Sequence, residues 1–440
     1  MPLVDLKKKI ADRSARIGVI GLGYVGLPVA ALFARKGFNV VGIDIKAERV
    51  ERINQGISPI EGKEPGLTEL IAEVAASKRL NSGTAYSLLH DCDIVLIDVE
   101  TPVNDAHIAE YHALKAALKS LGRVMKAEVL VIIESTIMPG TMQKIVLPLL
   151  EKYSRRKCGD GFYLGNCPER VMPGRLINNL NKMSRVVGGD SPATTDVMKE
   201  LYMQVVEADI DEADWITAEL VKTVENTYRD VQIAFANEVA LICEALGADV
   251  WRVRDLVRKS PGREMLLPGA GVGGHCIPKD PWLLASAVRG QDVELHLIPA
   301  ARAVNRGMPR HVLRLLKGKL GDLGGKKILV LGYAYLEESD DTRDSPSDHL
   351  IHLLEAEGAE AVAHDPFVTK YAGDIYALAE DSHAAVLMTA HSEYKDLDFK
   401  RLKNLMTRPL LVDGRNLWKS IGPKTVGFEL VRLGDFSRQD

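Results

Sequence analysis

Apolar and polar residues near the start of the chain follow two different periods in turn. In "RIGVIGLGYVGLPVAALFARKGFNVVGIDI", residues 16–45, a short apolar run precedes a glycine-rich turn. A stretch with apolar residues at helical spacing comes next, and a second apolar run closes the segment. This order predicts a strand, a turn, a helix and a strand, which is the arrangement of a dinucleotide-binding βαβ unit.

Further apolar runs predict that this unit continues into a larger sheet. "CDIVLIDV" ends shortly before Thr101, and "EVLVIIEST" ends at Thr136. A third strand and its loop are predicted in "GFYLGNCPERVMPGR". Ligands of open α/β sheets bind at the carboxyl ends of the strands, so we expect both threonines to line a cofactor cleft.

A long helix is predicted in the middle of the chain. Residues 214–246 contain neither proline nor glycine, and as a helix they would extend on the order of 45–50 Å. Such a helix typically braces two domains or a dimer interface. Lys222 and Asn226 are four residues apart and share one face. They belong to a polar stripe that either faces solvent or lines a buried cleft; its members are Glu219, Lys222, Asn226, Arg229 or Asp230, and Asn237.

The last part of the chain repeats the strand, loop, helix and strand order. Ser345 is the expected N-cap of that helix, and Gly358 is expected to close it. Only Gly332 follows the first strand, so a second dinucleotide is not implied. We therefore expect an α/β protein with two Rossmann-like doubly wound domains joined by a central helical domain with a long helix. The expected domains are residues 1–212, 213–312 and 313–440.

Composition narrows the class of protein. The chain has 440 residues, and its net charge of −4 at pH 7 comes from mixed acidic and basic residues. This pattern gives no basic footprint for nucleic acid. Its five widely spaced cysteines indicate thiols in a reducing compartment. No apolar run is long enough to span a bilayer, so we expect a cytoplasmic protein with neither a membrane nor a nucleic-acid partner.

The glycine turn carries the chemistry expected of a cofactor site. Gly21 permits the tight turn, Gly23 lets the backbone approach a pyrophosphate, and Gly26 allows the helix to pack closely on the strand. Asp44 ends the second strand, where a carboxylate can accept hydrogen bonds from a ribose diol and would repel a 2′-phosphate. The expected cofactor is therefore NAD.

A second candidate site lies in "GVGGHCIPKDPW", residues 271–282, where a glycine-rich loop presents Cys276. Asp280 is expected to begin a short helix ending near Arg289, and Lys279 with that helix N-terminus should favour the thiolate. An inert packed thiol is the alternative. We expect no metal site, because no second ligand pair has metal-type spacing. A thiol beside an NAD domain favours hydride transfer through a thiohemiacetal and a thioester.

Over nearly its whole length the sequence resembles the nucleotide-sugar 6-dehydrogenases. The resemblance implies an NAD-binding domain, a helical middle domain that dimerises, and a C-terminal domain that holds the UDP portion. It implies a UDP-sugar substrate and a homodimer or higher homo-oligomer. The motifs that carry it are "GLGYVGLP", "EPGL", "ESTIMPGT", "CPERVMPGR", "AELVKTVENTYRDV", "GVGGHCIPKDPW", "DDTRDSP" and "DGRN".

The resemblance also implies catalytic roles for matching residues. Cys276 would be the nucleophile, and Asn226 would stabilise the oxyanion. Glu169, with Thr136, would position or activate the water that hydrolyses the thioester. The groups expected to handle protons and orient the reactants are Lys222 and Asp280.

Binding residues follow from the same motifs. Arginines that follow strands can clamp phosphate bidentately, although a surface ion pair is the alternative for each. The residues expected to contact NAD are Gly21, Gly23, Tyr24, Val25, Gly26, Asp44, Arg49, Thr101, Thr136 and Arg343. Those expected to contact the nucleotide sugar are Arg170, Val171, Lys222, Asn226, Arg229, Arg263, Gly274, Tyr335 and Arg415.

Within the family, His275 and Trp282 are more similar to the members that oxidise UDP-N-acetylmannosamine. UDP-N-acetylglucosamine and UDP-N-acetylgalactosamine are the alternative UDP-N-acetylhexosamine substrates. Leu336 stands where the family usually has lysine. Arg263 is displaced by one position, and Arg258 could replace it. Two other functions are considered: a non-catalytic nucleotide-sugar sensor, and a 3-hydroxy-acid dehydrogenase that needs no thiol.

Overall fold

The structure is a computed structural model that describes residues 3–60, 64–170, 174–418, 424 and 426–436. The chain divides into two compact units. The first comprises Met1–Glu225 with Trp282–Val293, and the second comprises Asn226–Pro281 with Glu294–Asp440. The division falls within one long helix, α9 (Trp215–Leu246).

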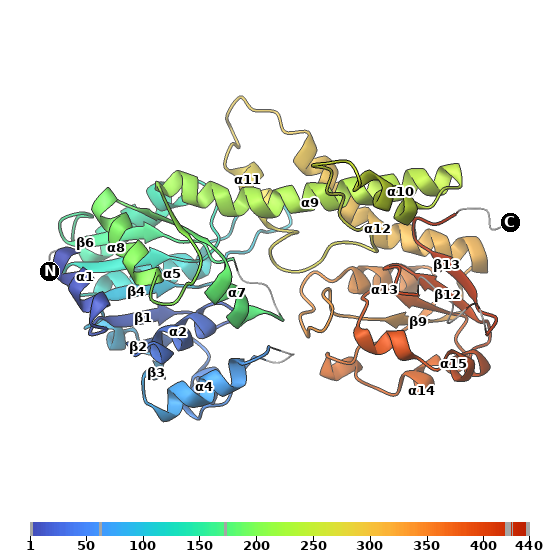
Figure 1. Ribbon diagram of the computed structural model, residues 1–440, viewed down its shortest axis with the longest axis horizontal. Coiled ribbons are helices and arrows are strands. Elements are labelled where there is room, and N and C mark those ends of the chain that lie inside the picture. The colour runs from blue at the N-terminus through green and yellow to red at the C-terminus, as the bar shows by residue number, and fades with distance from the viewer. Residues whose placement is uncertain (1–2, 61–63, 171–173, 419–423, 425, 437–440) are drawn as a thin grey trace. The chain divides into compact units, whose positions relative to one another are not determined.

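The first unit is built on an eight-stranded sheet of order β3-β2-β1-β4-β5-β6-β7-β8 (Figure 1). All neighbouring strands are parallel except β6 and β7. The chain reverses its direction of winding between β1 and β4, which makes this edge the topological switch point. The strands are β1 (Arg16–Ile20), β2 (Asn39–Ile43), β3 (Leu80–Gly83), β4 (Ile94–Ile97), β5 (Val129–Ile133), β6 (Phe162–Asn166), β7 (Arg185–Gly189) and β8 (Ile210–Ala213).

Helices cover both faces of this sheet, which explains why strands such as β4 and β5 are apolar throughout. One face packs against α1 (Leu3–Ala11), α2 (Gly26–Arg35), α4 (Leu67–Ala76), α7 (Leu176–Lys182) and α8 (Pro192–Tyr202). The other packs against η1 (Tyr86–Leu89), α5 (His112–Val124), the π-helix η2 (Met142–Val146) and α6 (Leu147–Ser154). Helix α3 (Ala47–Asn54) follows β2 and contributes Ile53 to the core on the first of these faces.

The second unit contains a five-stranded sheet of order β10-β9-β11-β12-β13, and all its neighbouring strands are parallel. Its switch point lies between β9 and β11. The strands are β9 (Lys327–Leu331), β10 (Glu360–His364), β11 (Ala384–Leu387), β12 (Leu410–Asp413) and β13 (Glu429–Arg432). Alternate residues of β9 enter two different cores, so this sheet is also covered on both faces.

One of these cores contains residues of α9, α10 (Val250–Val257), α12 (Leu297–Leu320) and α13 (Pro346–Ala356). The other contains residues of α14 (Ile375–Ala379), η4 (Ser392–Asp396) and α15 (Phe399–Leu405), and η3 (Thr369–Tyr371) follows β10. The predicted fold class is thus confirmed: two Rossmann-like sheets and a helical central segment with a long helix.

Several local predictions are confirmed. Helix α9 covers the predicted range to within one residue. Ser345 caps α13, because its hydroxyl accepts a hydrogen bond from the Ser347 N–H, and Gly358 follows that helix with a φ of 77°. The short helix α11 (Asp280–Ser286) begins at Asp280 and ends three residues before Arg289. Among the described helices, none is both long and apolar enough to cross a membrane.

Candidate active site

The glycine turn after β1 has the geometry of a phosphate cradle. Gly21 has a φ of +93°, and a Cβ there would collide with the carbonyl oxygen of Asp98. A Cβ at Gly26 would collide with the carbonyl oxygen of Gly21, whereas Gly23 has open space around it. Helix α2 begins at Gly26, and its N-cap Val25 supplies no side-chain hydrogen bond. Leu27 and Val29 donate their N–H groups to the carbonyl oxygens of Gly23 and Val25, so the open backbone around Gly23 at the start of α2 is what a phosphate could approach.

Asp44 lies directly after β2 and is only 5 % exposed. Its carboxylate accepts hydrogen bonds from the backbone N–H groups of Leu22 (3.0 Å) and Lys46 (2.9 Å). The guanidinium of Arg49 lies 2.9 Å from the same carboxylate. Each carboxylate oxygen can accept more than one hydrogen bond, so Asp44 keeps acceptor capacity for a ribose diol. The turn and the carboxylate together fit NAD.

A hydrogen bond joins the segments that follow β4 and β5. The hydroxyl of Thr101 donates a hydrogen bond of 2.6 Å to the carbonyl oxygen of Thr136. Thr101 is buried and Thr136 is half-buried. The two threonines therefore lie side by side at the switch point of the sheet.

In the second unit, two side chains and one backbone carbonyl hold the glycine loop before the thiol. The N–H of Gly274 donates to the carbonyl oxygen of Arg343 at 2.9 Å. A Cβ on Gly274 would lie 2.6 Å from the ring of Tyr335, so only glycine lets the ring pack this closely. Arg415 donates to the carbonyl oxygen of Gly271 at 3.2 Å. Tyr335 and Arg415 therefore shape this loop whatever else they bind.

Cys276 opens the turn that leads into α11. Its carbonyl oxygen accepts the N–H of Asp280 at 2.9 Å. The Asp280 side chain is fully buried, and its Oδ2 accepts a 2.5 Å hydrogen bond from the amide of Asn226. The ammonium of Lys279 lies 2.9 Å from Asp280 Oδ1. The charge of Lys279, which the sequence assigned to the thiol, is thus paired with Asp280.

A different cation is the electrostatic neighbour of the thiol. Burial lowers the pKa of Arg343, but its bidentate contact with Asp341 and the nearby Tyr335 and Cys276 raise it overall. Burial, with the positive charges of Lys279 and Arg343, lowers the pKa of His275 to about 4. His275 is therefore neutral at neutral pH, and Arg343 supplies positive charge near Cys276.

The polar stripe on α9 is buried, so the solvent-facing alternative is wrong. Glu219, Lys222, Asn226, Asp230 and Asn237 are each less than 10 % exposed. Buried polar groups require hydrogen-bond or charge partners, so these side chains must be paired within the fold.

Most of these partners are structural. Glu219 accepts hydrogen bonds from the N–H groups of Gly140 and Met142, and Asn237 accepts the N–H of Gly269 at 2.8 Å. Asp230 forms a buried ion pair of 2.7 Å with Arg302, while its neighbour Arg229 lies on the exposed face of the helix.

The loop after β6 holds Glu169, which is 8 % exposed. Its Oε1 accepts the N–H of Arg170 at 2.7 Å, and its Oε2 contacts the guanidinium of Arg185. The guanidinium of Arg170 lies 3.2 Å from Glu225. Val171 falls outside the described residues. Sequence reasoning missed Arg185, because nothing in its local pattern distinguishes it from an ordinary strand residue.

Arg263, and Arg258 as its alternative for the same substrate contact, both lie at the surface. Arg263 donates to the carbonyl oxygen of Pro261, and Arg258 lies 3.1 Å from Glu264. Both side chains are exposed, and each binds within its own segment. Their roles in substrate binding stay predictions.

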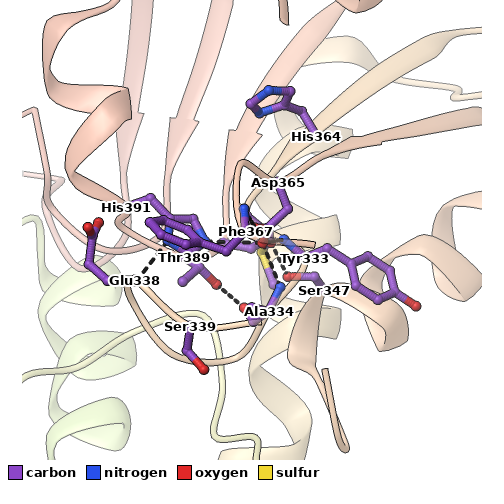
Figure 2. Close-up of polar contacts among 12 residues, drawn as sticks. Tyr333, Ala334, Glu338, Ser339, Ser347, His364, Asp365, Phe367, Thr389 and His391 are labelled. Carbon is purple, nitrogen blue, oxygen red and sulfur yellow. Dashed lines mark hydrogen bonds and ion pairs between the residues drawn. The ribbon is translucent and has the colours of Figure 1, made fainter. Parts of the chain in front are cut away.

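The strand ends of the second sheet form a closed network (Figure 2). Asp365 follows β10 and is fully buried. Its carboxylate accepts the N–H groups of Tyr333 (2.7 Å), Ala334 (2.8 Å) and Phe367 (2.9 Å), and His391 Nε2 lies 3.1 Å away. Four protein groups surround this carboxylate where a ribose would otherwise bind.

Comparison with known proteins assigns the chain to a class. Three models of the UDP-glucose/GDP-mannose dehydrogenase family match it: the NAD binding domain over residues 15–206, the central domain over 216–307 and the UDP binding domain over 329–420. The chain belongs to the UDP-glucose/GDP-mannose dehydrogenase family. It is therefore an oxidoreductase with an NAD-binding domain and a UDP-binding domain.

Individual relatives are similar along their full lengths. The chain is 37 % identical to UDP-N-acetyl-D-mannosamine dehydrogenase of Pyrococcus horikoshii, covering 95 % of this chain and 99 % of that protein. A solved structure of the UDP-D-ManNAc dehydrogenase from P. horikoshii superposes with a TM-score of 0.90 at 36 % identity, covering 96 % of this chain and 100 % of the other. The NDP-N-acetyl-D-galactosaminuronic acid dehydrogenase of Methanosarcina mazei superposes with a TM-score of 0.82 at 35 % identity, covering 98 % and 97 %.

Proposed function

We propose that this enzyme oxidises the C6 hydroxyl of UDP-N-acetylmannosamine to the carboxylic acid, with two NAD molecules each accepting one hydride. The names of the P. horikoshii relatives support this substrate, and so does His275 before the cysteine. We also propose the domain division at residues 1–212, 213–312 and 313–440.

The observation that carries this proposal is the pairing of Asn226 with Asp280 at the turn that Cys276 opens. A thiol at a turn is by itself no sign of catalysis. Here the buried amide of Asn226 binds the buried carboxylate of Asp280 at the start of α11, in the turn that begins at the thiol. Asn226 uses one of its two amide hydrogens on Asp280, so the second remains available to an oxyanion.

The proposed reaction starts with removal of the proton from the C6 hydroxyl while hydride leaves C6, which gives an aldehyde. The thiolate of Cys276 adds to the aldehyde carbon and forms a thiohemiacetal, whose oxygen we assign to Asn226 and Lys222. Loss of a second hydride gives a thioester. Water, oriented by Glu169 and Thr136, attacks this carbonyl and releases the acid and the thiolate.

The electrostatics near the thiol support this role for Cys276. The positive charge of Arg343 favours the thiolate over the thiol. His275 adds no charge at neutral pH, since burial and the neighbouring cations hold it in the neutral form. We therefore assign thiolate stabilisation to Arg343 as well as to the start of α11.

The decisive measurement is the yield of NADH per sugar at limiting UDP-N-acetylmannosamine, UDP-N-acetylglucosamine, UDP-N-acetylgalactosamine and UDP-glucose. We expect two NADH from UDP-N-acetylmannosamine. One NADH per substrate would favour a two-electron dehydrogenase, and binding without NADH would favour the sensor. Two NADH from another sugar, such as the galactosamine epimer, would keep the mechanism and overturn the substrate.

Substitution of the thiol tests the mechanism separately. Cys276→Ala should lower overall turnover by more than about 10³-fold, because the covalent intermediate cannot form. Cys158→Ala is the matched control, since this half-buried thiol contacts Asp190 and has no assigned role. Full turnover by Cys276→Ala, or equal loss in both variants, would defeat the proposed mechanism.

We further propose that the enzyme is a homodimer or a higher homo-oligomer, with α9 at the interface. Tyr228, Phe235, Ile242 and Leu246 recur at helical spacing and are 63 %, 60 %, 51 % and 78 % exposed. Such an apolar row on one helix marks an association surface. Phe235→Glu should shift the mass measured by sedimentation toward the monomer, whereas an unchanged mass would exclude this face.

A further inference from the structure

Three carboxyl groups and one guanidinium lie buried together in the first unit, at the carboxyl ends of β4 and β5 and the start of β7. Both carboxyl oxygens of Asp98 are buried, and Glu134, Glu169 and Arg185 are 1 %, 8 % and 3 % exposed. Only Glu169 has a proposed role in the reaction. The charges of Asp98 and Glu134 are not used by the mechanism, and buried charges require an explanation.

Side-chain contacts connect Glu134, Glu169 and Arg185 with Tyr202. The hydroxyl of Tyr202 donates a 2.5 Å hydrogen bond to Glu134 Oε1. Arg185 Nη1 lies 4.0 Å from Glu134 Oε1 and directly contacts Glu169 Oε2. The same guanidinium lies over the Tyr202 ring, 5.1 Å from its centre. Arg185 is therefore shared between Glu134 and Glu169.

Charge balance favours one proton within this cluster. Asp98 and Glu134 directly follow Ile97 and Ile133, which are paired in β4 and β5, so the two carboxyl groups leave the sheet side by side. Both carboxyl oxygens of Asp98 and Oε2 of Glu134 are buried without a hydrogen bond to another described group, and two neighbouring carboxyl groups can hydrogen-bond to each other only if one of them is protonated. Burial, and then the negative charge of Glu134, raise the pKa of Asp98 well above its usual value. With Asp98 neutral, one guanidinium faces two carboxylates instead of three.

We propose that Asp98 and Glu134 share one proton, and that this acid–carboxylate pair positions Glu169 through Arg185 for the attack of water on the thioester. The positioning part rests on the proposed function, because it assumes that Glu169 orients this water. The shared proton does not, since it concerns the resting protein alone. Asp98, Glu134 and Arg185 are positioning residues and touch no substrate in this proposal.

The pair also lies directly against the cofactor turn. A Cβ on Gly26 would lie 2.9 Å from the Cβ of Asp98, so the Asp98 side chain leaves no spare room beside α2. A larger or apolar replacement of Asp98 would therefore disturb the turn itself. Asp98→Asn keeps the shape and the donor of the protonated acid, which makes it the appropriate variant.

A loss of the shared proton at high pH should break the arrangement. Two adjacent carboxylates would then repel each other and draw Arg185 away from Glu169. The titratable or charged groups that face Asp98 and Glu134 from the surrounding elements are Glu169 and Cys167 after β6, Arg185 of β7 and Tyr202 of α8. Acid formation should therefore decline on the alkaline side before alcohol oxidation does.

The first experiment measures thermal stability against pH for wild type, Asp98→Asn and Asp93→Asn. Because the folded pKa of Asp98 is raised, its stabilisation is complete below the unfolded value of about 3.9 and is lost as pH rises. The thermal unfolding midpoint of Asp98→Asn should therefore rise relative to that of wild type as the pH increases. An unchanged difference across this range would show that Asp98 is ionised and would overturn the shared proton.

Asp93 is the matched control at the opposite end of β4. Burial works against it, but hydrogen bonds from Lys126, the N–H of Arg16 and Lys9 lower its pKa. Its stabilisation is thus present above pH 3.9 or so and is lost as pH falls, the reverse of Asp98. The thermal unfolding midpoint of Asp93→Asn should fall relative to that of wild type as the pH increases. Its turnover should be unchanged.

The second experiment tests positioning. Glu134→Gln should slow acid formation on the order of 10²-fold by misplacing Glu169, with little change in KM. The acylated Cys276 should then accumulate and be visible by mass spectrometry of the intact protein. Asp98→Asn should remove the alkaline decline of acid formation, because an amide has no proton to lose at these pH values.

The outcomes separate the two proposals. Folded Glu134→Gln that forms acid at the wild-type rate, without an acyl-enzyme, would overturn positioning. If wild type oxidises none of the sugars, the proposed function fails instead, while the stability experiment still decides whether the proton is shared. A rate loss in Glu134→Gln without accumulation of acyl-enzyme would place the defect before the thioester and would also overturn positioning.

Discussion

Asp44 and Asp365 occupy the same place in two similar sheets, each directly after the second strand of its βαβ unit. Both accept backbone N–H groups from the turn after the first strand: Leu22 for Asp44, and Tyr333 with Ala334 for Asp365. Asp365 is also enclosed by His391 and fully buried (Figure 2). The charged partner of Asp44 is Arg49 instead, 2.9 Å away, and its side chain is 30 % exposed where that of His391 is fully buried.

The first helices of the two βαβ units differ in how their N-termini are capped. Helix α2 starts without a side-chain cap at Val25. Helix α13 starts at Pro346, which has no N–H, and the hydroxyl of Ser345 accepts the next donor, Ser347. The protein's own groups thus satisfy the second helix start. The glycine and the acid after the strands are thus common to both units, and the units differ in how the start of the first helix and the charged partner of the acid are arranged.

The largest expected effect concerns the closed network. Asp365→Asn should lower the free energy of unfolding of the second unit by about 3–5 kcal/mol, because His391 and three N–H groups would lose a buried charged partner. Denaturant unfolding followed by probes in each unit would measure this, since two units need not unfold together. If Asp365→Asn is as stable as wild type, the carboxylate of Asp365 does not stabilise the second unit.

A smaller effect is expected at the open site. Asp44→Ala should weaken NAD binding by about 1.5–3 kcal/mol, or roughly 10-fold to 100-fold in Kd, through loss of charged hydrogen bonds to the ribose. It should also reduce the preference for NAD over NADP. Calorimetric titration would measure both, and Asp365→Asn, kept below its unfolding midpoint, should bind NAD like wild type. If Asp44→Ala binds NAD as tightly as wild type, Asp44 does not contact the ribose, and Asp44 and Asp365 do not differ in function.

Local signals in the sequence predicted much of the fold. The glycines of the first turn, Ser345 at a helix start and the uninterrupted segment of α9 each depend on neighbours only a few residues away. Their conformations follow from backbone sterics and short-range hydrogen bonds. The family motifs added the order of the domains and the candidate nucleophile.

Long-range packing decided the rest. The sequence left the polar stripe of α9 open between solvent and a buried cleft, and the burial of residues such as Asn226 excludes the solvent-facing alternative. The sequence predicted that Lys279 stabilises the thiolate of Cys276. In the fold, Lys279 is paired with Asp280, and Arg343 is the cation near Cys276. These contacts join residues that are distant in the chain, so no local period encodes them.

The sequence by itself determined that two βαβ units exist, where their turns lie and which thiol stands in a glycine loop. Only the tertiary structure decided which unit leaves its strand ends open, and which carboxylates share Arg185. The physical reason is that charge and hydrogen-bond partners are set by distance in space. Asp98 and Arg185 lie in one buried cluster only because β4 ends, and the antiparallel β7 begins, at the same edge of one sheet.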